Sequence, residues 1–233
     1  MNKTNNVNRR MYISMSATVF AGLAVLTLMP AKAWAQDTEE LSIGVLSALS
    51  GGGISWGMAV LGGVELAAEE INQAGGLKVG DKTYTLKIIA YDDKYAGPSA
   101  AQAAQRLVSQ DGVKIIFGPF GSVPVLATAD IVEGEGILSF INSYTAKALN
   151  ADKKYTFRLT PTTAEISSYM VDAIKRQVPE ARSVVILSPN DDSGKEVGSH
   201  SMPEYTRAGI EVQSHEFYER GLQDFVPILT RVL

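Results

Sequence analysis

The sequence predicts an α/β protein with parallel sheets, preceded by a segment that is removed on export. Two observations predict this. The first 35 residues have the order of charges and apolar residues of a secretory signal, and beyond them short apolar runs alternate with amphipathic stretches. Strands and helices that alternate at this spacing form βαβ units, whose parallel sheet is covered by helices on both faces.

The N-terminal segment indicates export. It is basic at its start, no acidic residue precedes Asp37, and residues 17–29 are almost entirely apolar. Residues 33–35 (Ala-Trp-Ala) give the small-x-small pattern of a signal peptidase site, so we expect cleavage after Ala35 and a periplasmic location. The apolar run is shorter than the roughly 20 residues of a membrane span. The Arg9-Arg10 pair leaves twin-arginine export open beside the general route.

The composition restricts the classes of partner. Removal of residues 1–35 takes away four cations and no acid, which changes the net charge from −4 to −8. Such an acidic chain disfavours nucleic acid or an anionic membrane surface as a partner. The absence of cysteine means that no disulfide framework is expected. No later run of about 20 apolar residues follows, so we expect no membrane insertion after cleavage.

The remaining elements follow from the periodicity of apolar residues. Predicted strands cover residues 41–49, 84–91, 113–118, 137–141, 183–187 and 210–214. Predicted helices cover residues 58–72, 98–110, 122–133, 162–177, 194–208 and 225–233. Thr162 and Glu165 have the spacing of a capping box at the start of the fourth helix.

These elements divide into two lobes. Residues 36–160 are predicted to form one sheet domain, and residues 161–233 the opening of a second. The second lobe has only two predicted strands, which is too few for an independent core. We therefore expect the second lobe to be truncated in this chain.

The candidate site lies where the strands end, because ligands of open parallel sheets bind beyond the carboxyl ends of the strands. The loops there are rich in hydroxyl groups and backbone N–H donors. Ser122 stands at a helix N-terminus, where free N–H groups and the helix dipole favour a carboxylate. The alternative is that Ser122 only caps its own helix. Trp56, in the glycine-rich loop of residues 50–57, is either a packing contact or a platform for an apolar ligand group.

The indication that other polar residues belong to a functional site is weaker. Ser143 and Thr145 fit either a site or the cap of a short helix. The aspartate pairs at residues 92–93 and 191–192 are expected to be turn and cap residues rather than metal ligands. The two histidines, at positions 200 and 215, have no partner at a metal-ligand spacing, and we expect both at the surface.

The sequence lacks the catalytic motifs that would indicate an enzyme. The chain has no G-x-S-x-G elbow and no G-x-x-x-x-G-K-[ST] phosphate loop. Residues 51–57 loosely match a dinucleotide-binding fingerprint, but the glycine spacing differs and no acidic residue follows at the required distance. We therefore expect no catalytic residues, no cofactor and no metal.

Six stretches together carry a resemblance to a known family. They are IGVLSALSGGGISWG (43–57), GVELAAEEINQAGGL (63–77), LKIIAYDDKYAGPSAAQAAQRLVSQDGVKIIFGP (86–119), IVEGEGILSFINSYTAKAL (131–149), YTFRLTPT (155–162) and LQDFVPILTRV (222–232). The chain resembles the branched-chain amino-acid-type solute-binding proteins of ABC importers, the leucine/isoleucine/valine-binding family with the type I periplasmic binding protein fold.

The resemblance implies two βα lobes with a ligand in the cleft between them. Ser122 matches the residue that holds an amino acid's carboxylate, and Ser143 the residue whose carbonyl takes the ammonium group. Thr145 matches a hydroxyl that touches both ends, and Trp56 an aromatic residue against the ligand side chain. Ser193 stands where the family often has an aromatic residue, which suggests a larger or more polar ligand than leucine.

The expected function is therefore capture of a small carboxylate-bearing solute, an amino acid or related organic acid, for the membrane permease of an ABC importer. Two alternatives remain open: a ligand-sensing receptor of the same fold for a signalling partner, and a non-functional truncated product. The family's acidic ammonium ligand and the strands that return to the first lobe are expected beyond Leu233.

Overall fold

The computed structural model describes residues 38–232, and from Glu39 onward the chain forms one compact unit. The predicted signal peptide and its cleavage site lie outside the described residues. Within the described range, no helix has both the length and the apolar character needed to cross a membrane.

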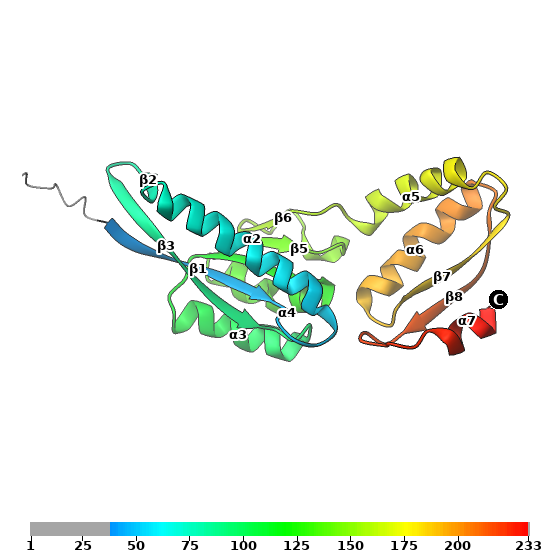
Figure 1. Cartoon of the computed structure of the whole chain (residues 1–233), viewed down its shortest axis with the longest axis horizontal. Helices are drawn as coiled ribbons and strands as arrows, with labels where there is room; N and C mark the ends of the chain where they lie inside the picture. Colours follow the sequence, from blue (N-terminus) through cyan, green and yellow to red (C-terminus); the bar gives the residue numbers. More distant parts are fainter. Residues whose placement is uncertain (1–37, 233) are drawn as a thin grey trace, which may run out of the picture. The chain divides into compact units, whose positions relative to one another are not determined.

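The first sheet has six strands in the order β2-β3-β1-β4-β5-β6 (Figure 1). They are β1 (Thr38–Ser47), β2 (Leu77–Val79), β3 (Lys82–Asp92), β4 (Ile115–Phe120), β5 (Leu138–Asn142) and β6 (Thr156–Arg158). The strands β1, β4, β5 and β6 pair in parallel, which confirms the predicted α/β class. The helices between them are η1 (Gly51–Gly53), α2 (Ile54–Gln73), α3 (Gly97–Ser109), α4 (Ser122–Gly134) and the short η2 (Ala146–Ala148).

The second sheet has two parallel strands, β7 (Ser183–Pro189) and β8 (Glu211–Tyr218). Its helices are α5 (Thr163–Gln177), α6 (Asp192–Arg207) and α7 (Val226–Val232). The capping box predicted for α5 is confirmed, because the Thr162 hydroxyl accepts from the Glu165 N–H and the Glu165 carboxylate accepts from the Thr162 N–H.

The sequence pattern did not predict two short strands, β2 and β6. The strand β2 pairs antiparallel with β3 through a tight turn at Gly80-Asp81, so the first sheet is not parallel throughout. A two-residue Gly-Asp connection between strands is a known hairpin signal that the apolar periodicity did not reveal. The strand β6 is only three residues long, too short to show a period.

Two element boundaries also differ from prediction. The helix α2 begins at Ile54, so Trp56 lies in its first turn and not in a loop. The 3₁₀ turn at Gly51–Gly53 runs directly into α2, which means that the glycine-rich segment continues as helix. The strand β8 runs on to Tyr218 rather than ending at Ser214, and it is paired with β7 along its length.

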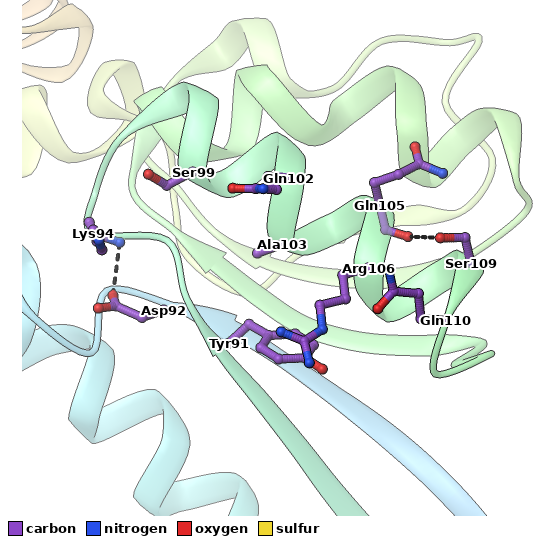
Figure 2. Close-up of a pocket in the computed structure, with 10 residues that line it drawn as sticks. All are labelled: Tyr91, Asp92, Lys94, Ser99, Gln102, Ala103, Gln105, Arg106, Ser109 and Gln110. Carbon is purple, nitrogen blue, oxygen red and sulfur yellow. Dashed lines mark hydrogen bonds between the residues drawn. The ribbon is translucent and has the colours of Figure 1, made fainter.

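A turn at the end of β3 is fixed by Asp92. Its Oδ1 accepts from the backbone N–H of Lys94 at 2.8 Å (Figure 2). The same oxygen accepts from the Leu49 N–H at 2.8 Å, and Oδ2 accepts from the Ser50 hydroxyl at 2.5 Å. Burial raises the pKa of this carboxyl, but the hydrogen bonds outweigh burial and lower the pKa. The prediction that this aspartate is a turn residue is confirmed.

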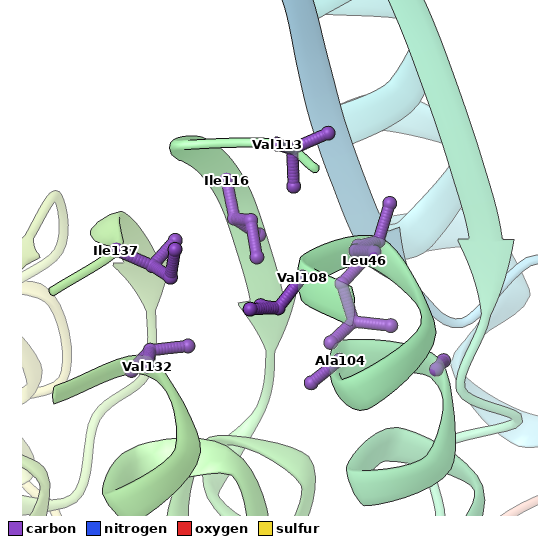
Figure 3. Close-up of a cluster of buried hydrophobic side chains, with 9 residues drawn as sticks. Leu46, Ala104, Val108, Val113, Ile116, Val132 and Ile137 are labelled. Atoms are coloured by element: carbon purple, nitrogen blue, oxygen red, sulfur yellow. The ribbon is translucent and has the colours of Figure 1, made fainter. Parts of the chain in front are cut away.

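The main core lies between the first sheet and the helices α3 and α4. Figure 3 shows side chains from β1, β4 and both helices converging there. The buried members are Leu46, Ala103, Ala104, Leu107, Val108, Val113, Ile116, Val132 and Ile137. Alanines on α3 let this helix approach the sheet closely, so that Leu107 and Ile116 are fully enclosed.

The opposite face of the sheet is covered in part by α2. Between α2 and strands β1, β3, β4 and β5 runs an apolar groove of about 590 Å³. Three phenylalanine rings lie in a row on the neighbouring strands β4, β5 and β6. The centroids of Phe117 and Phe140 are 5.1 Å apart, and those of Phe140 and Phe157 are 5.9 Å apart. The outermost ring, on Phe157, remains 49% exposed.

A buried carboxylate at the end of β3 makes stability depend on pH. Asp93 is fully buried, and its Oδ2 has no hydrogen-bond partner among the described residues. Burial raises the pKa of Asp93 to about 6, and the neighbouring Asp92 charge adds to the rise. The folded state therefore binds this proton more tightly than the unfolded chain does, and stability falls as pH rises through the window from about 4 to 6.

We expect Asp93→Asn to remove this pH dependence. Between pH 4 and 7 the wild type should lose about 2–3 kcal/mol of unfolding free energy through this group, and the variant should not. Urea unfolding at a series of pH values measures the difference. Asp152→Asn, at an exposed position, is the matched control. Equal pH slopes for the wild type and Asp93→Asn contradict the assignment.

Candidate functional site

A pocket of about 220 Å³ lies at the carboxyl ends of strands from both sheets. The residues that line it follow β1, β3, β4 and β5 in the first sheet and β7 and β8 in the second. They are Trp56, Tyr95, Phe120, Gly121, Ser122, Tyr144, Pro189, Ser193, Val197, Tyr218 and Arg220. Three of the five predicted site residues, Trp56, Ser122 and Ser193, therefore line one pocket.

Trp56 forms one wall. Its indole stacks on the Phe120 ring, with centroids 5.6 Å apart and planes inclined by 8°. The side chain is nevertheless 61% exposed, so much of the indole remains accessible beside the pocket. Both of the roles considered from the sequence, packing contact and ligand platform, are compatible with this geometry.

Ser122 is the first residue of α4 and does not cap it. The N-cap is Gly121, at φ 92°, and no side chain provides a capping hydrogen bond there. The expectation that Ser122 caps its own helix is therefore wrong. Its buried hydroxyl lies 3.3 Å from the Ser143 hydroxyl instead, which brings two of the predicted site residues together. No side chain provides an N-cap for α4, although the Tyr95 hydroxyl accepts a hydrogen bond from the Ser122 backbone N–H.

Ser143 and Thr145 lie behind the pocket and do not line it. The Ser143 carbonyl accepts from the Thr160 hydroxyl at 3.2 Å. The Thr145 hydroxyl caps the short helix η2 by accepting from the Lys147 N–H, as one of the two sequence interpretations proposed. Thr145 is fully buried, and its hydroxyl also donates to the Glu196 carboxylate on α6.

Ser193 belongs to a polar cluster at the start of α6. Its hydroxyl donates to Asp191 Oδ1 at 2.6 Å and accepts from Arg220 Nη2 at 2.8 Å. Asp191 caps α6 through the Gly194 N–H, which confirms its predicted role as a cap residue. Burial raises the pKa of the Asp191 carboxyl, but hydrogen bonds from Arg220 and Ser193 outweigh burial and lower the pKa.

Tyr95 is the central residue that sequence reasoning missed. It follows Lys94 in a left-handed backbone conformation, with φ values of 56° and 54°. Its ring carries the Arg220 guanidinium 4.3 Å above the centroid. Burial raises the pKa of the Tyr95 hydroxyl above its ordinary value, and neither the Arg220 charge nor the hydrogen bonds with Ser193 and the Ser122 backbone cancel that rise. No motif in the sequence marks a tyrosine in such a loop.

His215 differs from its predicted surface position. It is half-buried, its Nε2 forms a 2.5 Å hydrogen bond with the Ser188 hydroxyl, and burial lowers its pKa. Because β8 is longer than predicted, this histidine lies within a paired strand. Across residues 38–232, no group of three His, Cys, Asp or Glu residues could hold a metal ion.

A larger polar pocket of about 530 Å³ lies on the outer side of α3 (Figure 2). It is lined by residues of β3 and α3, and the Arg106 guanidinium stands 4.4 Å above the Tyr91 ring there. None of the five predicted site residues lines it. The smaller pocket between the strand ends is therefore the candidate functional site.

Comparison with known sequences finds relatives that are amino-acid-binding proteins. The Leu/Ile/Val/Thr-binding protein of Salmonella typhimurium is 29% identical over 223 residues, which cover 92% of this chain and 56% of the relative. The chain spans about half the length of the curated relatives it matches.

Comparison with solved structures finds the same architecture. A branched-chain amino acid transporter substrate-binding protein of Streptococcus pneumoniae, solved with isoleucine, is 24% identical with a TM-score of 0.71. The match covers 83% of this chain and 53% of that one. A solute-binding protein of an ABC transporter from Rhodopseudomonas palustris, solved with 3,4-dihydroxybenzoic acid, is 21% identical with a TM-score of 0.71. There the match covers 83% and 51% of the two chains.

These matches agree with the pattern of parallel strands and covering helices described above, which is that of the type I periplasmic binding proteins. The sequence family described as "Periplasmic binding protein" matches residues 40–233, which is nearly all of the described chain. The chain therefore belongs to the periplasmic binding protein family, and it is similar to the branched-chain amino-acid type within that family.

Proposed function

We propose that the protein captures a small carboxylate-bearing solute, an amino acid or related organic acid, between its two lobes and delivers it to the permease of an ABC importer. The observation that carries the proposal is a pocket at the strand ends of both sheets, which joins Trp56 and Ser122 to Ser193. Ligand sites in open α/β sheets lie at this position. Similarity in fold to substrate-binding proteins of transporters from Streptococcus pneumoniae and Rhodopseudomonas palustris supports the transport role.

The proposed mechanism has no covalent step. Backbone N–H groups at the start of α4 and the Ser122 hydroxyl replace water around the ligand carboxylate. The Ser143 hydroxyl, 3.3 Å away, orients the Ser122 hydroxyl toward the ligand. Aromatic rings enclose the rest of the ligand, and closure of the two lobes excludes water and presents a bound shape to the permease.

Removal of the Ser122 hydroxyl tests the carboxylate site. We expect Ser122→Ala to weaken binding of a carboxylate ligand by about 1–3 kcal/mol, because a buried carboxylate loses one donor. Isothermal titration calorimetry with leucine, isoleucine, valine and a panel of aromatic acids identifies a ligand first and then measures the change. Ser168→Ala, on α5 and outside the pocket, is the matched control. Unchanged affinity in Ser122→Ala means that this hydroxyl does not contact the ligand.

Truncation of Trp56 tests the pocket wall. We expect Trp56→Ala to lower the affinity by about 0.5–1.5 kcal/mol through lost stacking alone, and to change the order of preference among ligands of different side chains. Tyr169→Ala removes another exposed ring, 75% accessible and outside the pocket, and should leave binding unaltered. If Trp56→Ala preserves both affinity and preference, the indole is only a packing contact of Phe120.

A further inference from the structure

The candidate pocket is rich in aromatic residues. Five of the eleven residues that line it are Trp56, Tyr95, Phe120, Tyr144 and Tyr218. Phe120 stacks on Trp56, and its centroid lies 6.2 Å from that of Tyr95 at a tilt of 56°. Flat, rigid rings meet a planar ligand over a large area and lose little conformational freedom on binding. This lining favours a planar ligand body over a branched aliphatic one.

Arg220 is the one charged residue among those that line the pocket. Its Nε donates to Asp191 Oδ2 at 2.5 Å and its Nη2 to the Ser193 hydroxyl at 2.8 Å. A guanidinium has five N–H donors, so these two bonds leave donors for a ligand. In particular, Nη1 has no hydrogen bond to any residue of the described chain. The side chain is 29% exposed, and it lines the candidate pocket.

The position of Arg220 is fixed from both sheets. Asp191 and Ser193 hold its guanidinium from the second sheet, and the Tyr95 ring supports it from the first. Its backbone packs against the glycine-rich turn after β1: a Cβ added to Gly52 would stand 3.1 Å from the Arg220 Cβ. A guanidinium held in this way is preorganised for an acceptor group, which lowers the cost of ordering it on binding.

We propose that Arg220 is a specificity-determining residue, and that the preferred ligand is an aromatic acid with a second carboxylate or other hydrogen-bond acceptor on the far side of its ring. This inference rests on the proposed function, since Ser122 and α4 hold the first carboxylate. An aliphatic side chain would cover the free Arg220 donors without pairing them, which is unfavourable. A second acceptor on the ligand pairs with them. No acidic side chain lines the described pocket, so an acid without an ammonium group leaves no pocket carboxylate unpaired.

Calorimetry on the protein as processed in the periplasm tests the inference with benzoate, benzene-1,4-dicarboxylate and leucine. In the wild type, we expect the dicarboxylate to bind about tenfold more tightly than benzoate. Arg220→Gln should reduce that ratio to about one, because only the dicarboxylate places a second acceptor at the Arg220 donors. Arg207→Gln removes another arginine of the second lobe, paired with Glu204 and outside the pocket, and should leave the ratio intact.

The outcomes distinguish failure of the Arg220 inference from failure of the proposed function. If the dicarboxylate and benzoate bind equally in the wild type, if the ratio survives in Arg220→Gln, or if leucine binds more tightly than both, the inference is overturned and capture of a small acid stands. If no acid binds, the proposed function fails and the inference fails with it. Thermal unfolding reports whether Arg220→Gln is folded. If it is not, Arg220→Lys keeps the charge without the planar fork and should reduce the ratio severalfold.

Discussion

The stacking of the Arg220 guanidinium on the Tyr95 ring is the contact around which the candidate site is organised. The ring lies directly above Gly121, where any Cβ would come within 2.2 Å of a ring carbon, so only glycine fits at that position before α4. Left-handed backbone at Tyr95 and its neighbour costs of order 1–3 kcal/mol per residue. The N–H groups of Lys94 and Tyr95 donate to the Asp92 and Asp93 carboxylates at 2.8 and 2.7 Å, and these hydrogen bonds offset that cost.

Much of the fold could be predicted because local patterns determine it. The apolar runs that became β1, β4, β5 and β7 lie in buried strands, where a continuous apolar run is a sufficient signal. The hairpin strand β2 and the edge strand β6 are three residues each, and their place in the sheet depends on pairing with β3 and β5 rather than on their own sequence. The start of α2 was misplaced for a related reason, since glycine signals a loop but here forms the 3₁₀ turn before the helix.

Only those site residues whose position follows from the sheet topology could be predicted. The rule that ligands lie beyond strand ends led to Trp56, Ser122 and Ser193, which line one pocket. It selected the loop of residues 92–97 without distinguishing Tyr95, and it did not indicate Arg220, because their roles come from a contact about 125 positions apart in the sequence. The same limit applies to Glu196, whose hydrogen bond to Thr145 spans 51 positions and has no counterpart in local spacing.

The Glu196 contact bears on how a ligand is held. Thr145 is matched by resemblance to a hydroxyl that touches both ends of an amino acid, yet here this hydroxyl donates to a carboxylate with 9% residue exposure. Glu196 also accepts from the Thr163 hydroxyl at 3.3 Å, and the Lys147 ammonium lies 3.9 Å away. A ligand that takes the Thr145 hydroxyl must therefore exchange one hydrogen bond for another, for little net gain. A ligand acceptor at Arg220 makes no such exchange, because the guanidinium has donors beyond its bonds to Asp191 and Ser193. The chemistry that distinguishes ligands therefore lies in the pocket wall that carries Arg220, away from the buried junction at Glu196.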